Sequence, residues 1–190
     1  MRLFVALDFP DSVRASLRDL IARLRPSSSG VRWARPEGMH ITLKFVGEAD
    51  QGKLDAIRAA LSSVHSPQPI KMHFRGLGFF PNERKPRVLW CGVESSANLA
   101  ALAAGIESAL EPLGIPRESR GFVPHLTLGR FDSQRPPKGT DKLVSAANDL
   151  KSSEFGSARE LEFYLYQSVL RPAGAEYNRL AAFPFARDSE

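Results

Sequence analysis

Hydrophobic and polar positions alternate with two different periods along this chain, and segments with the two periods follow one another in a regular order. Runs with a period of two predict β-strands, whereas apolar residues three or four positions apart predict amphipathic helices. The first part of the chain is predicted to form a strand over 2–7, a helix over 13–24, a strand over 39–46, a helix over 53–64 and a strand over 70–76. The second part is predicted to form a strand over 87–92, a helix over 96–110, a strand over 123–131, a helix over 140–150 and a strand over 159–166, extended by 167–170. Loops are expected over 76–86 and 133–139, and a turn over 171–175 leads to a closing strand over 177–183.

The order of strand, helix, strand, helix and strand thus occurs twice, at an offset of 85 residues. Segment 2–7 matches segment 87–92 at this offset, and the repeat covers approximately 1–80 and 86–170. A chain of 190 residues with 43% hydrophobic residues can bury one substantial core. We therefore predict an α+β fold over 1–190, a single bilobal domain that is duplicated internally. It should contain two mainly antiparallel sheets, flanked by helices, with a central cleft.

One tetrapeptide, His-x-Thr-Leu, occurs once in each half. The copies are His40-Ile41-Thr42-Leu43 and His125-Leu126-Thr127-Leu128. In a strand, alternate side chains share a face, so each histidine lies beside its threonine while the aliphatic residues face the core. A single strand histidine is most simply explained as structural. Two copies at matched places favour one shared site.

Composition limits the partners and the compartment. The net charge of +5 favours an anionic partner such as nucleic acid, although excess charge also serves solubility. Basic residues gather at 32–35, 84–87 and 117–130, and most of the aromatic residues near them are expected in the core. The single cysteine, Cys91, excludes an internal disulfide and a cysteine cluster for zinc. No apolar run is long enough for a membrane span, so a cytoplasmic protein without membrane contact is expected.

Two histidines on opposite sides of a cleft suit in-line displacement at phosphorus, because the attacking and leaving oxygens each need a proton-transfer partner. Thr42 and Thr127 could donate hydrogen bonds to the non-bridging oxygens of the phosphate. Arg130 would add charge-assisted bonding if strand alternation through Gly129 brings it to the same face. Neither a zinc ligand set nor a nucleotide-binding glycine motif is present, so no metal and no cofactor is expected.

The two motif strands resemble those of the 2H phosphoesterase superfamily. Their flanks resemble its bacterial RNA 2′,3′-cyclic phosphodiesterase branch, once called 2′-5′ RNA ligase. The resemblance runs from residue 1 to about 185 and is carried by segments 2–7, 33–45, 124–130 and 170–177.

This resemblance implies hydrolysis of a terminal 2′,3′-cyclic phosphate on RNA to a 2′-phosphomonoester, without metal or ATP. It gives His40 the role of proton donor and His125 that of proton acceptor, an order that the repeat alone leaves open. It also implies reversible 2′-5′ ligation, with tRNA fragments among the candidate RNAs and a monomeric enzyme. The alternatives are a cyclic phosphodiesterase for small nucleotides or 2′-5′ oligoadenylates, and a noncatalytic protein that binds RNA ends.

Overall fold

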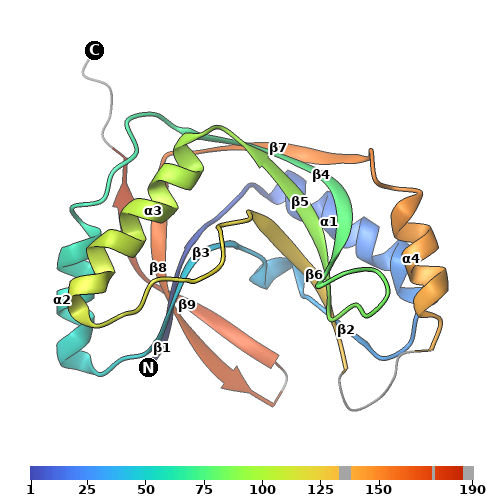
Figure 1. The fold of residues 1–190 in the computed structure, drawn as a ribbon, viewed down its shortest axis with the longest axis horizontal. Coiled ribbons are helices and arrows are strands. Elements are labelled where there is room, and N and C mark those ends of the chain that lie inside the picture. The colour runs from blue at the N-terminus through green and yellow to red at the C-terminus, as the bar shows by residue number, and fades with distance from the viewer. Residues whose placement is uncertain (133–137, 173, 186–190) are drawn as a thin grey trace.

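The computed structural model describes residues 1–132, 138–172 and 174–185, which form an α+β fold with two antiparallel sheets and flanking helices (Figure 1). The helices are α1 Asp11–Leu24, α2 Gln51–Leu61, α3 Asn98–Leu110 and α4 Thr140–Asn148, with 3-10 turns at Arg25–Ser27, Pro36–Gly38 and Glu111–Leu113. The strands are β1 Arg2–Leu7, β2 Val31–Trp33, β3 Ile41–Glu48, β4 Ile70–Phe80, β5 Val88–Ser95, β6 His125–Phe131, β7 Glu154–Glu160, β8 Glu162–Arg171 and β9 Gly174–Pro184. The predicted fold class is confirmed. No helix in these three segments is long and apolar enough to cross a membrane.

The sheets combine strands from both halves of the repeat. One sheet has the order β3-β1-β8-β9, and the other has the order β2-β6-β5-β4-β7. Within each half the first strand pairs with the motif strand, as β1 does with β3 and β5 with β6. The last strand of each half instead joins the sheet of the other half, so that β4 pairs with β5 and β8 pairs with β1.

The helices are exchanged in the same way. Helix α1 packs against β7 and α4, whereas α3 packs against β3 and α2. Figure 1 shows α2 and α3 together beside one sheet, and α1 and α4 together beside the other. One continuous cluster of buried side chains therefore includes residues of both sheets and all four helices.

Several strand boundaries differ from the sequence prediction. The loop expected over 76–86 begins only after Phe80, because β4 continues through Gly76 and Gly78. Gly76 adopts φ +68° at an irregularity in the pairing with β5, and a Cβ on Gly78 would lie 2.2 Å from the Trp90 ring. These glycines serve a strand rather than a turn. Strands β2 and β7 were not predicted. Residues 133–137 of the second predicted loop, and residue 173 of the predicted turn, lie outside the described residues.

A buried ion pair ties the motif strand of the first half to a helix of the second half. The Lys44 ammonium on β3 lies 2.7 Å from the Glu107 carboxylate of α3 and donates a 2.6 Å hydrogen bond to the Pro116 carbonyl. The Lys44 side chain is only 1% exposed. The pair fixes α3 against the back of the strand that carries Thr42.

Candidate active site

The two His-x-Thr-Leu motifs meet in one cleft between the sheets. Its volume is about 930 Å³, and all five residues singled out in the sequence line it: His40, Thr42, His125, Thr127 and Arg130. His40 immediately precedes β3 of one sheet, and His125 begins β6 of the other. The site is therefore a joint product of the two sheets.

The two imidazoles are held by equivalent hydrogen bonds. The His40 Nδ1 lies 2.9 Å from the Gly38 carbonyl oxygen, and the His125 Nδ1 lies 2.8 Å from the Val123 carbonyl oxygen. A carbonyl oxygen only accepts, so each Nδ1 carries the hydrogen and donates it. The Nε2 atom of each ring is consequently the nitrogen that remains for proton transfer.

The surroundings of the two imidazoles differ. His40 stacks on Phe4 at 4.4 Å between ring centroids and meets the edge of Tyr177 at 5.0 Å. Burial among these rings lowers the His40 pKa to about 4, since desolvation penalises the charged imidazolium. The hydrogen bond to Gly38 and the Asp8 carboxylate oppose this shift, while the charge of Arg14 adds to it. His125 meets the edge of Phe80 at 5.0 Å.

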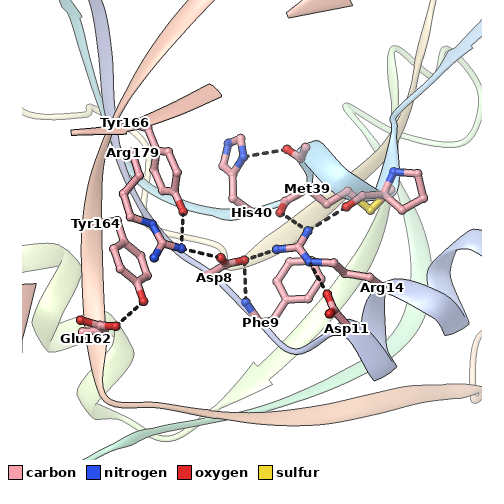
Figure 2. A network of polar contacts seen from close by, with 12 residues as sticks. Asp8, Phe9, Asp11, Arg14, Met39, His40, Glu162, Tyr164, Tyr166 and Arg179 are labelled. Atoms are coloured by element: carbon pink, nitrogen blue, oxygen red, sulfur yellow. Dashed lines mark hydrogen bonds and ion pairs between the residues drawn. The ribbon is translucent and has the colours of Figure 1, made fainter. Parts of the chain in front are cut away.

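A half-buried arginine holds the backbone just before His40 in place (Figure 2). The Arg14 side chain reaches from α1 and donates to the carbonyl oxygens of Pro36 at 2.7 Å and Met39 at 3.0 Å. Its other terminal nitrogen pairs with the Asp8 carboxylate, and the side chain is 14% exposed. These hydrogen bonds fix the Met39 carbonyl group, and therefore the backbone position from which the His40 side chain extends.

Asp8 is shared between two arginines. Its second carboxylate oxygen accepts a 3.0 Å hydrogen bond from Arg179 of β9, whose guanidinium lies 3.7 Å from the centroid of the Tyr164 ring. Figure 2 shows Asp8 between the two guanidinium groups, below the His40 ring. Sequence reasoning missed this network. Arg14 occupies an ordinary polar position of a helix and Asp8 follows a strand, so neither carried a local signal.

Two β-bulges at matched positions set which side chains reach the cleft beyond the motifs. Thr42 and Lys44 oppose consecutive residues of β1, and Thr127 and Gly129 oppose consecutive residues of β5, which leaves Leu43 and Leu128 without a direct partner. Regular alternation would send Arg130, five positions after His125, to the opposite face. The expectation that regular alternation through Gly129 brings Arg130 to the face of the motif was therefore wrong. The bulge at Leu128 reverses the alternation and turns Arg130 into the cleft.

The bulge in the first half has the same effect on Phe45, which stands at the position equivalent to Arg130. Most of the aromatic residues near the basic runs were expected in the core, but Phe45 is 56% exposed and lines the cleft. Leu170 and Tyr177 add further exposed apolar surface to the same cleft. Exposed rings beside cationic groups are typical of surfaces on which nucleobases stack.

Other reactive residues lie elsewhere. Cys91 is buried on β5, and burial raises the pKa of its thiol to about 12, so it carries no nucleophilic thiolate at neutral pH. His65 and His73 are exposed and do not line the cleft. Over residues 1–132, 138–172 and 174–185, no group of three or more His, Cys, Asp or Glu side chains could hold a metal ion.

Known proteins are similar to this chain in sequence and fold over almost its whole length. The family model described as LigT like phosphoesterase matches residues 7–90 and 92–177. An Archaeoglobus fulgidus protein named RNA 2′,3′-cyclic phosphodiesterase is 39% identical over 183 residues, covering 96% of this chain and 99% of that protein. A crystal structure of a Thermus thermophilus protein aligns with a TM-score of 0.78 at 31% identity, covering 97% of this chain and 98% of the other. Escherichia coli LigT, crystallised with 3′-AMP, aligns with a TM-score of 0.77 at 25% identity and covers 98% of both chains. The chain belongs to the LigT-like phosphoesterase family.

Proposed function

We propose that this chain hydrolyses the terminal 2′,3′-cyclic phosphate of RNA to a 2′-phosphomonoester. The observation that carries the proposal is the matched pair of imidazoles in one cleft, each with Nδ1 bonded to a carbonyl and Nε2 left for proton transfer. Relatives named RNA 2′,3′-cyclic phosphodiesterase at 31–39% identity support the same reaction.

In this reaction a water oxygen attacks phosphorus while the bond from phosphorus to O3′ breaks. The His125 Nε2 accepts the proton of the attacking water, and the His40 Nε2 donates a proton to the departing O3′. Thr42 and Thr127 lie beside their histidines in the cleft and donate hydrogen bonds to the non-bridging oxygens as negative charge develops. The phosphate stays on O2′, and two proton exchanges with solvent reset the histidines.

The same geometry supports joining of RNA ends. A 5′-hydroxyl oxygen can attack phosphorus in place of water and pass its proton to the His125 Nε2. The bond from phosphorus to O3′ breaks, the His40 Nε2 protonates O3′, and a 2′-5′ phosphodiester results. Neither direction requires a metal ion or ATP for proton transfer. Activity should therefore persist in a chelator.

The test is a product assay on a short RNA that ends in a 2′,3′-cyclic phosphate, run in a chelator and resolving 2′- from 3′-phosphate. His40→Ala and His125→Ala should each lower kcat by about 10² to 10⁴, the usual contribution of a positioned acid or base. Thr42→Ala and Thr127→Ala should cost less. His73→Ala, which removes an exposed histidine outside the cleft, is the matched control.

Three outcomes would redirect the proposal. Full activity in either cleft variant would contradict the two-histidine mechanism. Turnover of small cyclic nucleotides or 2′-5′ oligoadenylates in preference to RNA would favour the alternative substrates. Tight binding of the RNA end without turnover would indicate a noncatalytic binder.

A further inference from the structure

Two arginines stand directly opposite each other at one rim of the cleft. Arg32 of β2 pairs with Arg130 of β6 in the antiparallel register. Directly opposite residues have Cβ atoms about 5 Å apart, and like charges in such a pair destabilise a sheet. Both side chains are exposed and both line the cleft. An unfavourable pair facing a binding cleft indicates that an anion belongs between the two guanidinium groups.

The charges nearby do not neutralise this pair. The cleft lining that the structure describes includes five arginines and no carboxylate side chain. Arg171 is engaged by Glu176 at 3.2 Å. Across the described segments, Arg32 and Arg130 have no carboxylate within ion-pair distance. The two guanidinium groups therefore remain available to a ligand.

The arginine pair lies about one phosphate spacing away from the place where the two motifs would hold the cyclic phosphate. Arg130 follows Thr127 on β6, and the bulge at Leu128 reduces their separation to two regular strand steps, about 7 Å along the strand. That displacement is comparable with the distance between successive phosphates along an extended nucleic acid strand. A phosphate held between the two arginines would thus be the neighbour of a phosphate held by the motifs.

We propose that Arg32 and Arg130 together bind the backbone phosphate that links the terminal nucleotide to the nucleotide before it. The inference rests on the proposed function and specifies its substrate class as oligoribonucleotides of at least two residues. Paired guanidinium groups suit this role because each presents several donors in a planar fork to phosphate oxygens.

The asymmetry of the cleft gives the RNA a direction. Phe45 occupies the position in the first half that Arg130 occupies in the second, and it is 56% exposed. At these equivalent positions β3 offers an aromatic ring, while β6 and its neighbour β2 offer two guanidinium groups. The upstream RNA chain leaves the cleft past β2 and β6.

The experiment compares two substrates that differ only in the charge of the internal linkage. One is a diribonucleotide ending in a 2′,3′-cyclic phosphate, and the other carries a neutral methylphosphonate between the two nucleotides. Wild-type enzyme should prefer the charged linkage by about tenfold in kcat/KM, as expected for loss of a charge-assisted contact. Arg32→Gln and Arg130→Gln should each bring this ratio close to one. Arg75→Gln, an exposed arginine outside the cleft, should keep the wild-type ratio.

Two further measurements complete the test. Arg32→Gln should lower the slope of log KM against log salt by about 0.7, the value for one contact with a single-stranded phosphate. It should also unfold at a temperature no lower than wild type, since it removes a like-charge neighbour. A wild-type ratio near one, or a ratio unchanged in Arg32→Gln, would overturn the inference while leaving cyclic phosphate hydrolysis intact. Absence of turnover on both substrates and on a cyclic mononucleotide would instead contradict the proposed function.

Discussion

The protonation state of His40 provides the sharpest test of the two-histidine mechanism. Burial against Phe4 and Tyr177 lowers its pKa to about 4. Compared with the ordinary value of 6.5, this lower pKa disfavours protonation of His40 by ~3 kcal/mol. At pH 7 only about one His40 in a thousand would carry the proton that a donor needs.

A bound phosphate must therefore supply the missing stabilisation. An anion within about 4 to 6 Å favours the imidazolium, so anion binding and His40 protonation should be coupled and reciprocal. We expect sulfate, whose own charge does not change between pH 4 and 9, to raise the His40 pKa by about two units. Equivalently, sulfate should bind more tightly as the pH falls from the bound pKa toward the free pKa.

The assay is an NMR titration of the imidazole protons with and without sulfate. His40→Gln assigns the signal, and the exposed His73 provides a reference outside the cleft. A free-enzyme His40 pKa near 6.5 would show that the aromatic contacts do not desolvate the ring. A depressed pKa that sulfate leaves unchanged would refute the assignment of His40 as the donor to a bound phosphate.

Three further predictions follow from other contacts. Lys44→Met should destabilise the fold by about 3 kcal/mol in urea unfolding, because it leaves the Glu107 carboxylate charged and partly buried. The double variant Lys44→Met, Glu107→Leu should recover most of that loss. Equal instability of the single and double variants would contradict this explanation. Arg14→Ala should lower kcat by up to about 100-fold through misplacement of His40, and it should raise the His40 pKa because the charge of Arg14 lowers that pKa. The control is Arg23→Ala, which removes an exposed arginine of the same helix. If both variants have the same kcat and the same His40 titration, Arg14 does not position His40. Folded His40 takes up its proton only near pH 4, while the unfolded chain does so near pH 6.5. Wild type should therefore lose up to ~3 kcal/mol of stability relative to His40→Gln as the pH falls through that window, as measured by urea unfolding at each pH.

The local elements and the motif residues could be predicted from sequence because each depends on neighbours along the chain. Strand β1, helix α1 and the meeting of His40 with His125 follow from periodicity and from the repeat. The exchange of β4 and β8 between sheets could not be predicted, since it depends on which edge a strand joins. Arg130 shows the limit clearly. A single bulge reverses the alternation, and Gly129 beside it is the local signal from which a bulge could have been suspected.

Residues that act through the backbone were equally invisible in the sequence. Arg14 contacts carbonyl groups of residues 36 and 39, more than twenty positions away. Every residue has a backbone carbonyl group, so the sequence does not indicate which carbonyl groups accept hydrogen bonds from Arg14. Only the packing of α1 against the turn before β3 brings the guanidinium to its acceptors.

The pairing of β1 with β8 also affects the order in which the protein folds during its synthesis. Phe4 lies opposite Tyr166, so these partners are separated by 162 residues of chain (166 − 4). Contacts of such long range are slow to form, and on a ribosome the pairing of β1 with β8 waits until nearly all of the chain has emerged, although β1 can pair with β3 earlier. The sheet that carries His40 is thus among the last parts to close. A chain synthesised only as far as β6 therefore has both motifs but still lacks β8 and β9, whose Ser168, Leu170 and Tyr177 line the cleft.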